Sequence, residues 1–185
     1  MEKLTDSLSS TMLLGQTSAT PSTLAVCVSL GWPIVGDSVP VSRSNCSTSS
    51  PNKQHVVRVL SRSFVTGHPD AWRDEISPWL ATWKQSAARP TPTHRFCRWL
   101  HDQGVLVRLY TQNVDGLHTH EDLFTATWAE KVVECHGSIR DGSIVLYGDA
   151  LPPRVAHCLA EDFGAGSDVD LVMVFGTSLQ VAPFC

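Results

Sequence analysis

Short apolar runs, separated by helix-like and polar stretches, organise this chain. Val105 to Tyr110, Val132 to Cys135 and Asp170 to Phe175 are rich in β-branched and aromatic residues, which is typical of buried strands. In the first half, Thr23 to Leu30 has the same character. Val56 to Val65 alternates between apolar and polar residues, and this predicts a further, weaker strand.

Helical periodicity appears between these runs. Pro78 interrupts a stripe of large apolar residues, so we expect a break there, with Ser77 capping a new helix. The helical spacing favours core packing over a base-stacking platform for the tryptophans. The stripe consists of Trp72, Ile76, Trp79, Leu80 and Trp83.

Two further helices are predicted downstream. Thr93 caps one from His94 to Gln103, which Gly104 closes. Pro152 to about Phe163 forms the other. The inward residues of the first helix are expected to be Phe96, Cys97, Trp99 and Leu100. Helices that alternate with strands across short connections predict an α/β fold with a parallel sheet covered by helices.

Composition and charge argue against two classes of protein, those that bind nucleic acid and those that span a membrane. The 185 residues carry a formal net charge of −4, which argues against a nucleic-acid surface, and no apolar run is long enough to cross a membrane. Residues 1–65 form a variable segment, Ser/Thr/Pro-rich over 1–53, and residues 66–185 hold the sharper signals. The six cysteines form no CxxC pair, so we expect a reduced intracellular protein without a zinc module.

Polar residues follow three of the predicted strands. Because strand ends converge in open α/β sheets, we expect one composite ligand site. His136, followed by a glycine, is a candidate general base, although a lone histidine is more often structural or solvated. Asn113 and Asp115 can point into the same crevice or form an Asx turn. Gly176-Thr177-Ser178 suits ribose or phosphate oxygens.

Four motifs in this order resemble those of the sirtuin family of NAD-dependent protein deacylases. Arg89 to His94 also resembles the family's xPTxxH lead-in to a helix, so the resemblance covers about residues 66–185. It implies a Rossmann-like parallel sheet with flanking helices. The motifs are Thr111 to His118 (TQNVDGLH), His136-Gly137, Val145 to Asp149 (VLYGD) and Gly176 to Phe184 (GTSLQVAPF).

The resemblance implies a role for each matching position. His136 is the general base for a ribose hydroxyl of NAD, and Asn113 lies by the same ribose. Gln112 contacts ribose hydroxyls, and Asp115 contacts the nicotinamide carboxamide. Gly176, Thr177 and Ser178 hold the ribose–phosphate part. Val145, Tyr147 and Gly148 lie along the acylated lysine peptide, which adds as a strand. The acyl group passes to ADP-ribose and nicotinamide is released.

The chain also departs from the family pattern. Nothing in residues 1–65 matches the GAGxS loop, and only nine positions separate His136 from Val145, where the family carries its CxxC zinc module. The sequence ends just past the fourth motif. We therefore expect a truncated or variant deacylase whose fold is incomplete at the N-terminal and C-terminal ends and lacks the small zinc module. The alternatives are an inactive remnant that binds partners through a sheet edge, or an incomplete gene product.

Overall fold

A parallel sheet forms the centre of the protein. The computed structural model describes residues 24–28, 58–85, 88–176 and 183. Four strands lie in the order β3-β2-β1-β4, and every pairing is parallel. They are β1 (Leu24–Val28), β2 (Leu106–Thr111), β3 (Val132–Glu134) and β4 (Leu171–Phe175). The predicted strands in these four places are confirmed, and with them the α/β class.

The register of the sheet brings the strand ends into line. Val28 pairs with both Thr111 and Phe175, and Thr111 pairs with Glu134. These four residues form one row across the sheet, close to the carboxyl end of each strand. The polar residues that follow β2, β3 and β4 therefore begin at the same edge of the sheet.

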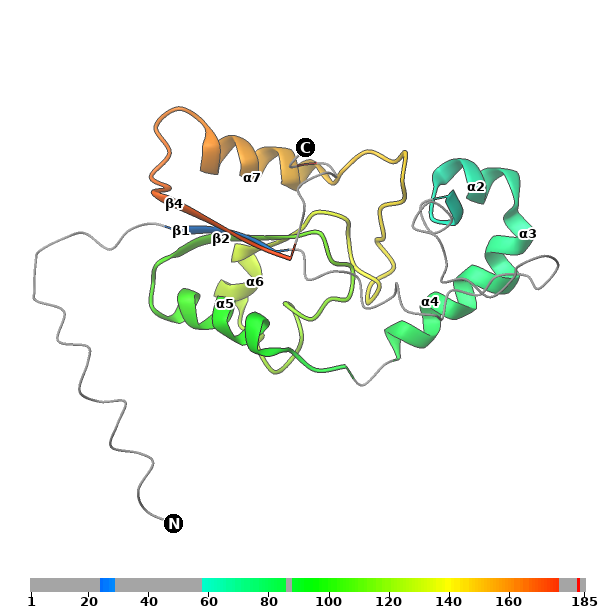
Figure 1. Ribbon diagram of the computed structural model, residues 1–185, viewed down its shortest axis with the longest axis horizontal. Coiled ribbons are helices and arrows are strands. Elements are labelled where there is room, and N and C mark those ends of the chain that lie inside the picture. Colours follow the sequence, from blue (N-terminus) through cyan, green and yellow to red (C-terminus); the bar gives the residue numbers. More distant parts are fainter. Residues whose placement is uncertain (1–23, 29–57, 86–87, 177–182, 184–185) are drawn as a thin grey trace, which may run out of the picture.

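Helices cover both faces of the sheet (Figure 1). The helices α5 (Pro92–Asp102) and α6 (Ala126–Lys131) lie on one face, and α7 (Pro153–Phe163) lies on the other. Between the sheet and the helices α5 and α6 lies a core cluster that includes the fully buried Cys97, Leu109 and Trp128. On the other face, α7 packs Val155 and Cys158 on Tyr110. The predicted helix near Pro152 to Phe163 is confirmed; α6 was not predicted.

The helix α5 begins earlier than its sequence suggests. Its N-cap is Thr91, two residues before the predicted Thr93, and Pro92 occupies the first turn. His94 stands at the third helical position and accepts the backbone N–H of Thr91 at 3.2 Å. A histidine replaces the Glu or Gln that usually closes such a capping box, so the pattern is hard to find in the sequence. At the other end Gly104 has a φ of 72°, as expected after a helix.

A separate group of helices lies beyond the carboxyl ends of the strands (Figure 1). It comprises α2 (Arg62–Gly67), α3 (Pro69–Ala71), a π-helical turn at Trp72–Ile76 and α4 (Ser77–Lys84). The strand predicted for Val56 to Val65 is wrong over its described part, residues 58–65: Ser61 caps α2 by accepting the N–H of Phe64, and the strand-like pairing seen there is an isolated bridge between Ser61 and Tyr147.

The break predicted at Pro78 is also wrong. Ser77 keeps helical dihedral angles (φ −62°, ψ −44°), and its N–H bonds to the carbonyl of Trp72, five residues back. Proline cannot donate a hydrogen bond and crowds the preceding turn, and a π turn accommodates both without ending the helix.

Core packing explains the tryptophan stripe. Ile76 and Trp79 are buried, and the other three members of the stripe pack against them. By contrast, two residues that we expected to face inward do not: Phe96 is 36% and Trp99 is 52% exposed, whereas Cys97 and Leu100 are buried. Phe96 and Trp99 stack on each other with ring centroids 5.9 Å apart, and Phe96 also meets Phe175 of β4 edge-on at 6.2 Å.

Candidate active site

The ends of β2 and β3 are joined by direct hydrogen bonds. The N–H of Cys135 donates to the carbonyl of Thr111 at 2.8 Å, and the N–H of Ile139 donates to the carbonyl of Val114 at 2.7 Å. Between these two bonds, Nδ1 of His136 lies 3.1 Å from the carbonyl oxygen of Gln112. The first two polar turns predicted from the sequence therefore form one structural unit.

This last contact fixes the proton arrangement of His136. A backbone carbonyl only accepts hydrogen bonds, so Nδ1 must donate its proton to the carbonyl of Gln112. In the neutral ring, Nε2 is then the nitrogen that accepts a proton. This is the tautomer that a general base requires.

Asn113 and Asp115 point toward each other beside this histidine. Nδ2 of Asn113 donates to Oδ2 of Asp115 at 3.3 Å, while Oδ1 of Asp115 accepts the N–H of Leu117 at 2.9 Å. The second bond closes an Asx turn, which is one of the two interpretations that the sequence allowed for Asp115. Oδ1 of Asn113 is buried and has no hydrogen-bond partner among the described residues. Such an atom suits a hydroxyl or amide donor from a ligand.

The third polar turn begins at Gly176, directly after β4. Gly176 is exposed and has a φ of 63°. Two strand spacings separate β4 from β2, about 10 Å, so Gly176 and Gln112 start on one edge at opposite sides of β1. Thr177 and Ser178 lie outside the described residues.

Gly137 allows the chain to turn tightly behind His136. Its φ is 70°, and a Cβ added there would lie 1.9 Å from the carbonyl oxygen of Ser143. In addition, the N–H of Val145 donates to the carbonyl of His136 at 2.9 Å. The loop from 137 to 145 is thus folded back against His136, and it fits there because residue 137 has no side chain.

The segment expected to bind peptide is already paired with the chain itself. The N–H of Tyr147 donates to the carbonyl of Leu60 at 3.0 Å, and the carbonyl of Tyr147 accepts the N–H of Arg62 at 2.9 Å. Arg62 also forms two 2.7 Å bonds with the carboxylate of Asp149. No backbone hydrogen bond to Val145 carbonyl or Gly148 is found within the described part of the chain.

Glu134 is a site residue that the sequence did not single out. It ends β3 two residues before His136, and its Oε1 accepts the hydroxyl of Thr119 at 3.2 Å. Burial, together with the nearby carboxylates of Asp141 and Asp115, raises the pKa of Glu134 to about 7, although the Thr119 hydrogen bond and Arg140 act in the opposite direction. Because burial depends on the tertiary structure, no local sequence signal could have identified this residue.

Two buried histidines lie close to these residues. His94 and His118 are each 1% exposed, and their rings lie 4.3 Å apart. Burial, followed by the neighbouring His94, lowers the pKa of His118 to about 3, and burial lowers the pKa of His94. Both rings are therefore neutral near pH 7.

A cavity lies between the helical group and the loop that follows His136. Its volume is about 360 Å³. Arg62 and Lys84 contribute to its lining, which is otherwise mainly apolar: Val65, Trp72, Leu80, Ile139, Ile144 and Leu146.

Comparison with known proteins identifies the family. The family model "Sir2 family" matches residues 50–143. The chain is 35% identical over 128 residues to "NAD-dependent protein deacetylase sirtuin-3" of Mus musculus, covering 52% of this chain and 37% of that protein. It is 29% identical over 158 residues to "NAD-dependent protein deacetylase 2" of Geobacillus kaustophilus, covering 71% of this chain and 61% of that protein.

The chain thus spans less than two thirds of the length of these relatives. Over the described residues, no helix is long and apolar enough to cross a membrane. The family match covers the end of β2, the loop with Asn113 and Asp115, and His136. This chain belongs to the Sir2 family.

Proposed function

We propose that the chain is an NAD-dependent protein lysine deacylase in a variant form. The observation that carries the proposal is the bond from Nδ1 of His136 to the carbonyl of Gln112, beside Asn113 and Asp115. It joins the two polar turns and sets the histidine in the tautomer of a general base. Relatives at 29–35% identity are named NAD-dependent deacetylases.

The residues of the site suit the ribose and nicotinamide of NAD. The unpartnered Oδ1 of Asn113 would accept a ribose hydroxyl, and the carboxylate of Asp115 would accept the amide N–H of the nicotinamide. Gln112 and the turn at Gly176, Thr177 and Ser178 would hold the remaining ribose–phosphate part. NAD supplies the anomeric carbon and the nicotinamide leaving group, and the acyl group passes to ADP-ribose.

The acylated lysine would approach from the side of the loop after His136. The apolar lining of the nearby cavity suits the acyl group and the aliphatic part of lysine. Main-chain pairing would use Val145 and Gly148, because both backbone groups of Tyr147 already bond to residues 60 and 62. The nine positions from His136 to Val145 support a form without the CxxC zinc module.

Incubation with NAD and an acetyl-lysine peptide tests the proposal. We expect nicotinamide release that depends on the peptide and is lost in His136→Ala. That variant should still show NAD-dependent thermal stabilisation, since it keeps Asn113 and Asp115. Nicotinamide release that is no greater from the wild-type chain than from His136→Ala would refute the catalytic assignment.

One observation favours a second candidate, a non-catalytic binding module. Strand β4 forms an edge of the described sheet, and Leu171, Val172 and Val174 are 52%, 45% and 45% exposed. Exposed apolar edge strands pair readily with other chains. A cooperative melting transition that NAD does not shift, together with no nicotinamide release, would support this candidate over the enzyme.

A further inference from the structure

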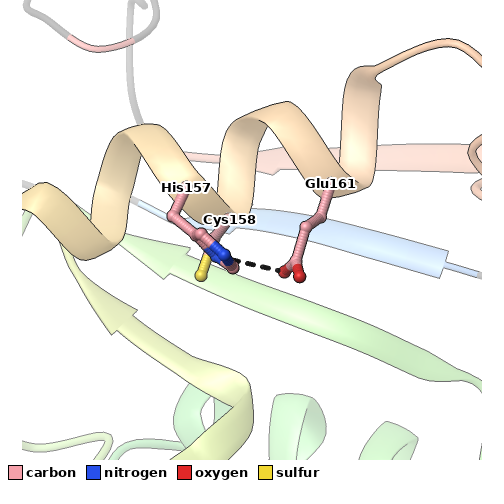
Figure 2. Close-up of side chains that lie close together, drawn as sticks. All are labelled: His157, Cys158 and Glu161. Carbon is pink, nitrogen blue, oxygen red and sulfur yellow. Dashed lines mark ion pairs between the residues drawn. The ribbon is translucent and has the colours of Figure 1, made fainter.

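Three side chains with metal-binding atoms gather on one turn of α7. His157, Cys158 and Glu161 each offer one ligand atom, and these atoms all lie within 4.8 Å of one another. Figure 2 shows the imidazole and the carboxylate side by side, with the sulfur close to the imidazole. This cluster lies on the helix that covers the sheet, and the proposed deacylase chemistry does not use it.

We propose that His157, Cys158 and Glu161 form a binding site for a thiophilic divalent cation, with Zn²⁺ as the best fit. A thiolate, an imidazole and a carboxylate are the ligands that Zn²⁺ prefers, whereas Mg²⁺ and Ca²⁺ prefer oxygen alone. Nδ1 of His157 lies 3.5 Å from Oε2 of Glu161. Ligand atoms of tetrahedral zinc are separated by about 3.3 Å for such a nitrogen–oxygen pair. Solvent would supply the fourth ligand.

The burial of the three residues supports a ligand on the outer side of the helix. The side chains of His157 and Glu161 are 71% and 52% exposed, so a metal ion can reach them. Cys158 is 3% exposed and packs in the core cluster with Tyr110, so its sulfur would form the inner side of the site. An exposed His–Glu pair alone contributes little to stability.

The charges around the cluster match a divalent ion. Arg108 donates two hydrogen bonds to the buried carboxylate of Asp162, so these two charges cancel. Arg108 also donates to Oε2 of Glu161 at 3.0 Å and holds that carboxylate in place, as outer-shell partners do in metal sites. The Glu161 carboxylate is the charge left. Zn²⁺ would bind the sulfur of Cys158 as a thiolate and displace its proton, so that two negative ligands balance the ion.

Metal titration of the purified full chain tests this site independently of deacylase activity. We expect Co²⁺ to give a thiolate-to-cobalt charge-transfer band that Zn²⁺ abolishes at one ion per chain, with one proton released. His157→Asn and Glu161→Gln should each weaken zinc binding roughly 10- to 100-fold, at least the effect of losing an outer-shell partner. Both substitutions are on the surface, so they leave the fold intact.

Matched controls are available on other helices. His68→Asn and Glu130→Gln alter exposed residues away from the cluster and should leave zinc affinity unchanged. Cys158→Ala should lose the charge-transfer band. The proposal is overturned if that band persists in Cys158→Ala, if His157→Asn and Glu161→Gln bind zinc as tightly as the wild type, or if the wild-type chain binds no zinc.

Discussion

Replacing Glu134 by Gln should remove a pH-dependent loss of stability. The carboxyl is partly buried at the end of β3, and its pKa of about 7 compares with 4.5 for a free glutamate. Below 4.5 it is protonated in both the folded and unfolded states, and above 7 it is ionised in both. Between these values the folded state binds more protons, so stability falls as the pH rises.

The size of this loss follows from the two pKa values. They differ by about 2.5, and at 1.36 kcal/mol for each pH unit the folded protein loses about 3 kcal/mol of unfolding free energy between pH 4.5 and 7. Glutamine keeps the size of the side chain and an oxygen that accepts the Thr119 hydroxyl, but it does not ionise. Glu134→Gln should therefore gain stability relative to the wild type as the pH rises.

Urea denaturation from pH 4.5 to 8 measures this difference. Groups that titrate elsewhere act equally on both proteins, so the difference in unfolding free energy isolates Glu134. Glu130→Gln, on the exposed side of α6, is the control and should give a flat difference curve. If the curve for Glu134→Gln is equally flat, burial does not perturb this carboxyl and the reasoning fails.

Three further changes test the site and its support. Asp115→Asn keeps the acceptor for the Leu117 N–H but removes the charge, so nicotinamide exchange should weaken while urea stability stays within about 0.5 kcal/mol. Asp162→Ala removes the buried carboxylate that pairs with Arg108 and accepts the Tyr110 hydroxyl, and it leaves Arg108 with the more exposed Glu161, which should lower the unfolding free energy in urea by about 3–5 kcal/mol. Gly137→Ala forces a Cβ onto the Ser143 carbonyl. Its control is Gly142→Ala, at a φ of 81° with no atom within 4 Å, which imposes only the backbone strain of about 1–2 kcal/mol. The melting temperature should therefore fall further for Gly137→Ala than for Gly142→Ala.

The sequence predicts the sheet well because its strands are short, buried and rich in β-branched residues. The prediction fails where local and tertiary effects compete. Phe96 and Trp99 fit an inward helical face, but Cys97 and Leu100 are the two of the four expected residues that join the buried core. At Pro78 the sequence indicates a break, yet a π turn keeps the helix continuous. Neither outcome can be derived from spacing alone.

Part of the candidate site could likewise be predicted from the sequence, and part could not. The resemblance and the strand ends placed Gln112, Asn113 and His136 together, and the structure confirms the contact between 112 and 136. That Tyr147 bonds to residues 60 and 62 was not predictable, because the pairing joins segments 85 or more residues apart. Contacts between distant segments leave no periodic pattern in either segment.

Burial shifts the pKa values of several groups near the candidate site and so limits which of them can control the pH dependence of catalysis. His118, with a pKa of about 3, stays neutral across pH 5–8, and burial lowers the pKa of His94, so its ring is neutral at pH 7 and above. Glu134 does titrate there, and the carboxylate of Asp115 is among the groups that raise its pKa, so the two side chains interact. Comparing nicotinamide release by the wild type and Glu134→Gln across pH 5–8 therefore isolates Glu134, because the pH-dependent component that the substitution removes belongs to this carboxyl.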